Sequence, residues 1–85
     1  VMAAPGYPES PMMGVPVVLP RTLPEGTLLF SAGLSGKPYV SKGGRVVNAV
    51  GLGATVAEAV RRAYTLVDAV KLEGALVRRD IGAGL

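Results

Sequence analysis

The chain has 85 residues, a length that allows one small domain. It contains no cysteine and no histidine, which excludes a disulfide framework, a thiolate metal site and any mechanism that needs a histidine base. Nine Lys and Arg against six Asp and Glu give a net charge of +3, a weak indication of an anionic partner. We therefore expect no catalytic residue and no metal site in this chain.

The sequence begins with valine rather than methionine, and we interpret residues 1–85 as one domain of a longer protein. No stretch approaches the ~20 consecutive apolar residues that a membrane-spanning helix needs, so we expect no membrane partner.

The first third of the chain is rich in proline. Six of the seven prolines fall within the first 24 residues. Residues 1–4 are compatible with a short strand. Residues 14–20 predict an edge strand or an extended segment, because Pro16 cannot donate to a ladder. The β-formers of residues 27–32 predict a further strand.

The middle of the chain alternates strands with glycine. Residues 34–38 predict a tight connection. Residues 39–42 and 45–51 predict two strands, and Gly43–Gly44 between them predicts a hairpin turn or a bulge.

The clearest element is a helix over residues 55–72. Thr55 and Glu58 have the spacing of a capping box, and apolar residues then recur at three- and four-residue steps. Lys71 suits the helix C-terminus and Gly74 predicts the stop, followed by one more short strand and a loop. The expected fold is α+β, with about six antiparallel strands in a small curled sheet or half-barrel and one long helix.

Other side chains near the helix have structural interpretations. We expect Tyr64 to lie in the core with its hydroxyl directed outward. Arg61 and Arg62 are interpreted as solvated or paired with acidic residues of the same helix, and Arg79 and Asp80 as an ion pair that fixes the tail.

The glycines around residue 50 admit two interpretations. A strand, Gly51-x-Gly53 and a helix form the layout of a dinucleotide-binding turn, but Val56 stands at the third glycine position. The alternative is that glycine, which tolerates positive φ, turns the strand into the helix here and turns one strand into the next at Gly43–Gly44.

A separate interpretation concerns Lys42, Gly43, Gly44 and Arg45. Two glycines before an arginine allow close approach of a ligand, expose backbone N–H groups and place a guanidinium that can hold an anion bidentately. Lys42 adds a point charge. The alternative is an ordinary surface arginine.

Taken in chain order, several segments resemble one family. The segments "APGYP" (4–8), "LFSAG" (29–33), "VSKGGRVVNAVGLGATVAEAVRRAY" (40–64) and "RRDIG" (78–82) are similar to the C-terminal domain of phosphoribosylamine–glycine ligase, also called glycinamide ribonucleotide synthetase. The resemblance extends over nearly the whole chain, and its most specific part is G-G-R-V followed by G-x-T-x-x-E-A and A-Y.

The resemblance implies an ATP-grasp ligase of purine biosynthesis. The full enzyme uses ATP and Mg²⁺ to activate glycine as glycyl phosphate, and the amine of phosphoribosylamine attacks it to give glycinamide ribonucleotide. ATP and Mg²⁺ would be bound by N-terminal and ATP-grasp domains outside this chain. The resemblance also implies that this domain completes the substrate cleft without catalysing alone, and that the enzyme is cytoplasmic.

Carried over by position, the family's glycine-glycine-arginine segment falls on Gly43, Gly44 and Arg45. We expect these residues, with Lys42, to face the ribose-phosphate side of the cleft. The chain departs from the family's H-A-G-T pattern, since Ser31 and Leu34 stand where the histidine and threonine are usual.

The sequence leaves two alternatives open. The chain resembles, less specifically, the C-terminal lobe of another ATP-grasp carboxylase or ligase. A free-standing basic module that binds a polyanion such as RNA is the other alternative, although the scattered bases and only four aromatic residues favour no nucleic-acid partner.

Overall fold

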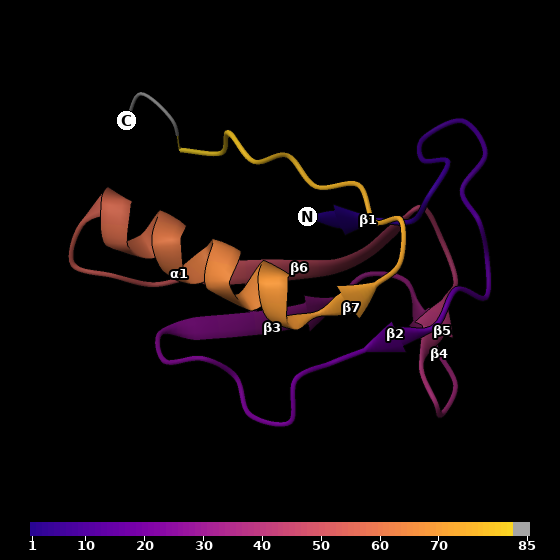
Figure 1. Cartoon of the computed structure of the whole chain (residues 1–85), viewed down its shortest axis with the longest axis horizontal. Coiled ribbons are helices and arrows are strands. Elements are labelled where there is room, and N and C mark those ends of the chain that lie inside the picture. Colours follow the sequence, from indigo (N-terminus) through magenta and orange to yellow (C-terminus); the bar gives the residue numbers. More distant parts are fainter. Residues whose placement is uncertain (83–85) are drawn as a thin grey trace.

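A computed structural model describes residues 1–82 of the chain, and it shows the expected α+β fold (Figure 1). Over residues 1–82, seven short strands lie in three antiparallel sheets, and one helix packs against the largest of them. That sheet has the order β1–β6–β3 and consists of β1 (Met2–Ala3), β6 (Arg45–Gly51) and β3 (Thr27–Ser31). The strands predicted around these residues are therefore confirmed.

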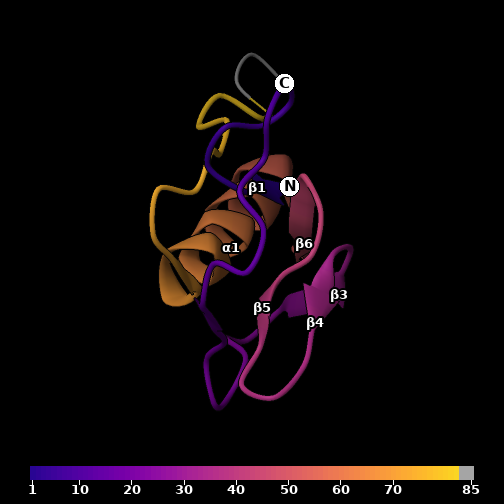
Figure 2. The ribbon, with the colours of Figure 1, turned by 90° about the vertical axis from the view of Figure 1, so that its right-hand side faces the viewer.

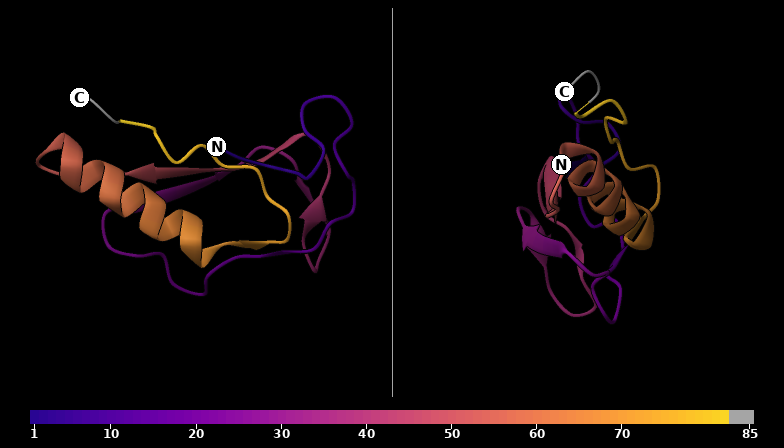
Figure 3. Two further views of the ribbon diagram at one scale, coloured as in Figure 1. Left: turned by 45° about the horizontal axis from the view of Figure 1, so that its top comes forward. Right: turned by 90° about the vertical axis from the view of Figure 1, so that its left-hand side faces the viewer.

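The helix α1 (Val56–Ala69) lies along one face of β6 and β3 (Figure 3). Its start is as predicted, because the Thr55 side chain accepts a hydrogen bond from the Glu58 N–H (3.1 Å). The Glu58 carboxylate pairs with Arg62 at 2.7 Å, which confirms one of the two interpretations of that arginine.

The predicted helix end is wrong. The helix stops at Ala69, and Val70 is already extended. Lys71 and Leu72 form strand β7, which pairs with β2 (Val17–Val18). Gly74, with a φ of 73°, turns the chain after β7 rather than after the helix. The pairing of two distant segments thus ends the helix earlier than its own sequence indicates.

The predicted hairpin at Gly43–Gly44 is also wrong. Strand β5 (Val40–Ser41) pairs with β4 (Leu34–Ser35), and β6 pairs with β1 and β3 (Figure 2). The two glycines therefore carry the chain from one sheet to another. The expected tight connection over residues 34–38 contains β4, and the expected bulge lies within the β1–β6 pairing instead.

The last strand predicted after the helix is replaced by a single bridge. Leu76 exchanges two backbone hydrogen bonds with Ala3, both 2.9 Å long. The tail that follows runs back along the helix (Figure 1). Residues 83–85 of the predicted loop-like end lie outside the described residues.

The hydrophobic core lies between α1 and the helix-facing side of the sheet. Its buried members come from four strands, the helix and two residues that flank them: Met2, Ala4, Val17, Val46, Val47, Leu66, Val67, Val70 and Leu72. The shortest extent of the molecule is 16 Å, which has room for one helix layer on one sheet layer. Within residues 1–82, no helix is long and apolar enough to cross a membrane.

The other face of the sheet is uncovered and apolar. Leu28 pairs with Val50 and Phe30 with Asn48, so these four side chains share the face opposite the helix. Leu28 is 42% exposed and Phe30 is 53% exposed. We call Leu28, Phe30 and Val50 the outer apolar face.

Candidate functional site

The Lys42–Arg45 segment enters β6 and is held by backbone hydrogen bonds on both sides. The Lys42 N–H donates to the carbonyl oxygen of Gly33 (2.8 Å), and the Ala4 N–H donates to the carbonyl oxygen of Gly44 (2.7 Å). A side chain at Gly33 would collide with the carbonyl oxygen of Arg45 (2.6 Å). Residues Ser31–Leu34, which differ from the family's H-A-G-T pattern, therefore pack directly against the backbone of the predicted site.

The two glycines of this segment have different surroundings. A Cβ on Gly44 would collide with the ring of Tyr7, whereas a Cβ on Gly43 would meet nothing within 4 Å. Neither residue has a positive φ, so the conformational explanation of these glycines is wrong. Within residues 1–82, neither N–H group has a hydrogen-bond acceptor, which leaves two donors beside Arg45.

The cations of this segment are not neutralised by the described part of the chain. Lys42 and Arg45 are exposed, and neither pairs with a carboxylate within residues 1–82. A guanidinium that makes no hydrogen bond to the described residues, next to two backbone N–H groups in the same condition, can bind a phosphate or carboxylate. This arrangement is what the anion-site interpretation requires, although a solvated arginine would have the same surroundings.

Arg45 borders a hollow of about 400 Å³ that the sequence did not predict. The walls are largely apolar, and two guanidinium-bearing residues and one tyrosine contribute to them. The lining residues are Val1, Ala3, Tyr7, Arg45, Leu76, Val77 and Arg78. Tyr7 and Arg78 are missed by sequence reasoning because each lies far from Lys42–Arg45 in the chain, and only β1 brings them together.

At the opposite end of β6, Gly51 and Gly53 have a packing role. A Cβ on Gly51 would collide with the helix backbone at Ala59 and at Ala63 N (2.6 Å), and one on Gly53 would meet Ala59 N at 2.8 Å. The helix thus closes directly over the turn where a pyrophosphate would lie. The dinucleotide interpretation is not supported, and neither glycine has the positive φ of the turn interpretation.

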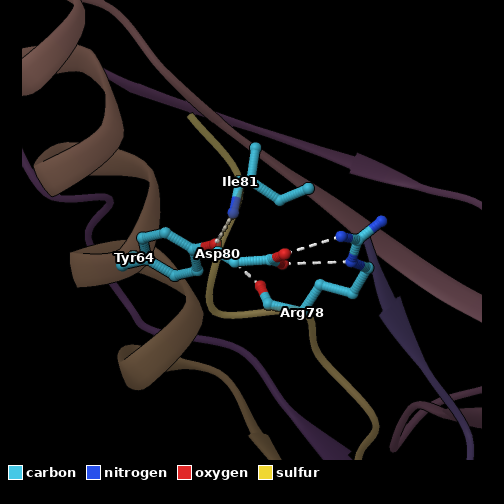
Figure 4. A network of polar contacts seen from close by, with 4 residues as sticks. All are labelled: Tyr64, Arg78, Asp80 and Ile81. Carbon is cyan, nitrogen blue, oxygen red and sulfur yellow. Dashed lines mark hydrogen bonds and ion pairs between the residues drawn. The ribbon is translucent and has the colours of Figure 1, made fainter. Parts of the chain in front are cut away.

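The tail is fixed to the helix by Tyr64 (Figure 4). Its hydroxyl donates to the carbonyl oxygen of Arg78 (2.7 Å) and accepts from the Ile81 N–H (3.0 Å), which agrees with the predicted outward hydroxyl. Arg78 binds Asp80 bidentately, through Nε (3.0 Å) and Nη2 (2.7 Å). Hydrogen bonds from this guanidinium lower the pKa of the Asp80 carboxyl below its ordinary value.

The predicted Arg79–Asp80 ion pair is wrong. Arg79 points to the other side of the tail, where it pairs with Asp68 of the helix at 2.9 Å and lies 5.4 Å from the centre of the Tyr64 ring. Arg79 is therefore engaged by the helix and is not among the residues that line the hollow of Arg45 and Arg78.

The described residues hold no set of metal ligands. Among residues 1–82, no three Asp, Glu, His or Cys side chains come together. Another hollow, of about 300 Å³ between α1, β6 and the tail, is mostly apolar. Among the described residues, Lys42 and Arg45 pair with no carboxylate, and a separate, more polar hollow of about 400 Å³ is lined in part by Asp68 and Arg79.

Comparison with known proteins places these features in a family. The model of the family "Phosphoribosylglycinamide synthetase, C domain" matches residues 1–84. The chain is 46% identical to phosphoribosylamine–glycine ligase of Thermotoga maritima over 83 residues, which is 95% of this chain. It is 41% identical to the ligase of Chlorobaculum tepidum over 87 residues, or 98% of this chain.

A solved structure shows the same fold. The crystal structure of the Thermotoga maritima ligase matches 94% of this chain with a TM-score of 0.83 and 44% sequence identity. The match covers 20% of that structure's chain, and likewise 20% of the two curated relatives named above. The chain thus spans about a fifth of the length of these relatives.

Proposed function

The chain belongs to the phosphoribosylglycinamide synthetase C-domain family, and from this premise we propose that it is the C-terminal domain of a phosphoribosylamine–glycine ligase. The family match over residues 1–84 and the relatives that are five times longer support this assignment. Residues 1–85 then form a single domain, and N-terminal and ATP-grasp domains of the same polypeptide are its partners.

The proposed full enzyme joins glycine to phosphoribosylamine in the cytoplasm. ATP and Mg²⁺, bound by the other domains, convert glycine to glycyl phosphate, and the amine of phosphoribosylamine attacks to give glycinamide ribonucleotide. The present chain has no catalytic role by itself. Its contribution is to position the amine by holding the phosphate of the substrate.

The surroundings of Gly43 are the observation that carries this assignment of roles. Gly43 has neither a positive φ nor a crowding neighbour, so nothing within residues 1–82 explains why a side chain is missing there. A phosphate that approaches the backbone explains it, because a side chain would block the two free N–H groups. Arg45 and Lys42 supply the opposite charge.

Holding a phosphate far from the reacting amine helps the reaction by orientation. A bound anchor converts the encounter of amine and acyl phosphate into a nearly intramolecular step. A charge-assisted hydrogen bond of the kind that Arg45 would make contributes about 1.5–3 kcal/mol. The phosphate itself undergoes no change in this reaction, so its contacts persist from substrate to product.

The outer apolar face is the surface on which we expect the other domains to dock. It exposes Leu28 and Phe30, the latter being the sole phenylalanine of the chain. An apolar sheet face of this kind is normally covered in a stable protein. The relatives are about five times longer than this chain, and we expect their additional domains to cover this face.

Steady-state kinetics of the full-length ligase that carries this chain test the proposal. We expect Arg45→Gln to raise the KM for phosphoribosylamine about tenfold, the equivalent of about 1.4 kcal/mol. The KM for glycine and ATP should stay unchanged. Arg61→Gln is the matched control, since Arg61 is an exposed arginine on the outer side of the helix. An unchanged KM for phosphoribosylamine in Arg45→Gln would contradict the assignment.

A further inference from the structure

Strand β1 brings the tail motif R-x-D-I-G (78–82) next to Arg45. Ala3 pairs with Arg45 on one side and with Leu76 on the other. Residues paired across neighbouring strands point to the same face, so Arg45 and Leu76 flank Ala3 about 10 Å apart, which is two strand spacings. Arg78 follows Leu76 by two residues and lines the same hollow as Arg45.

The backbone of Arg78 is fixed in this place. The Tyr64 hydroxyl binds the carbonyl oxygen of Arg78 and the N–H of Ile81, so the helix holds both ends of the turn (Figure 4). Arg79 is engaged elsewhere by Asp68. The tail thus presents one particular arginine to the hollow, and Asp80 holds its guanidinium there through two hydrogen bonds.

We propose that Arg78 is the second cation of the phosphate site, and that a phosphate monoester replaces Asp80 on its guanidinium. This inference rests on the proposed function, because it takes Arg45 to be the first cation. It adds a substrate-binding residue from a motif that the Lys42–Arg45 segment does not include.

Exposure and charge both favour the exchange. The Arg78 and Asp80 side chains are 76% and 61% exposed, and ion pairs as exposed as this contribute little to stability. The fork of the guanidinium fits a phosphate as well as a carboxylate. A phosphate monoester carries about two negative charges at neutral pH, which the two arginines together balance.

The Asp80 carboxylate is then a built-in competitor. While the site is empty it occupies the guanidinium fork, and it leaves when phosphate binds. Removing the charge of Asp80 should therefore strengthen phosphate binding, whereas removing the guanidinium of Arg78 should weaken it. A purely structural Arg78–Asp80 pair predicts something different, because either substitution would break the same contact.

Affinity for ribose 5-phosphate in the full-length ligase tests this inference. We expect Arg78→Gln to weaken binding roughly fivefold to tenfold, and Asp80→Asn to strengthen it roughly threefold, by the loss and gain of one charge-assisted contact. Arg79→Gln is the matched control, an arginine of the same tail that faces the helix, and its affinity should equal that of the native enzyme. Neutral ribose at the same concentrations should show none of these differences.

Opposite signs for Arg78→Gln and Asp80→Asn would support the proposal. Equal weakening by both variants, or no change in either, would overturn it and leave the pair a structural staple of the tail. Arg45→Gln, measured alongside, separates this result from the proposed function. Normal affinity in Arg45→Gln means that the first cation is wrongly assigned, and an effect in Arg45→Gln without one in Arg78→Gln refutes only the second cation.

Discussion

The two ends of β6 each carry glycines, and their surroundings are opposite. At the end next to the helix, Gly51 and Gly53 are so close to α1 that any side chain would collide with its backbone. Just before the strand begins, Gly43 faces open space, and its N–H group has no acceptor within residues 1–82. The role of a glycine at either end therefore follows from what a side chain at that position would meet.

The difference also separates stability from binding along one strand. The crowded end allows the helix to approach the sheet and bury the core, so it contributes to folding. At the open end, a side chain on Gly44 would meet the Tyr7 ring, but a side chain on Gly43 would displace no neighbour among the described residues. A change at one end should therefore alter the free energy of unfolding, and a change at the other should alter ligand affinity.

The largest expected effect is at the crowded end. Gly51→Val would force its side chain into the helix backbone at Ala59 and Ala63, and we expect the free energy of unfolding to fall by about 3 kcal/mol or more. Urea unfolding, monitored by far-ultraviolet circular dichroism, measures this loss in the free energy of unfolding.

The matched change is Gly43→Val, where we expect the free energy of unfolding to change by less than about 0.5 kcal/mol. Similar losses at both ends would contradict the distinction between a packing end and a binding end.

A second contrast lies between the two faces of the same sheet. Phe30→Glu should leave the isolated chain folded, because Phe30 is 53% exposed and outside the core. In the full-length ligase the same change should destabilise domain docking by about 2 kcal/mol, the value of burying a phenylalanine. Thermal unfolding of both proteins distinguishes the two effects. Equal behaviour of the chain and the ligase would mean that this face is not a docking surface.

A smaller expected effect sharpens the role of the open end. Gly43→Ala adds one methyl group beside the two free N–H groups, and we expect glycinamide ribonucleotide to bind about threefold more weakly, or about 0.7 kcal/mol. The unfolding curve should not move. Unaltered affinity would show that no ligand approaches the backbone at Gly43.

The smallest expected effect concerns the pH dependence of the tail. The Arg78 guanidinium lowers the pKa of Asp80, so the stability that this pair adds is present above the ordinary carboxyl pKa and is lost as the pH falls through the lowered value. Arg78→Gln should return the Asp80 pKa to its ordinary range. A carboxyl titration by nuclear magnetic resonance measures it, and an unchanged pKa would mean that the pair does not persist in solution.

Local signals in the sequence were sufficient for some elements and not for others. The helix start at Thr55 is predictable because the cap involves Glu58, three residues away. The helix end is not, because Lys71 and Leu72 pair with β2, more than fifty residues earlier in the chain. The hairpin predicted at Gly43–Gly44 is absent because β5 pairs with β4, the strand just before it, whereas β6 pairs with the more distant β1 and β3.

The candidate site divides in the same way. The Lys42–Arg45 segment is contiguous, so its glycines and cations can be recognised together in the sequence. Tyr7 and Arg78 lie beside this segment because β1 pairs with both β6 and Leu76. No local sequence pattern predicts that pairing. The sequence did indicate that R-x-D-I-G was distinctive, but gave no reason to place it beside Arg45.

Calorimetric titration of glycinamide ribonucleotide into the full-length ligase tests the central claim most directly, with the native enzyme compared to Arg45→Ala. The claim that the open end of β6 holds the substrate phosphate predicts a loss of affinity of about tenfold or more, which corresponds to about 1.4 kcal/mol. Equal affinity of the two proteins would contradict it, and would leave this domain a scaffold whose glycines serve only packing and chain direction.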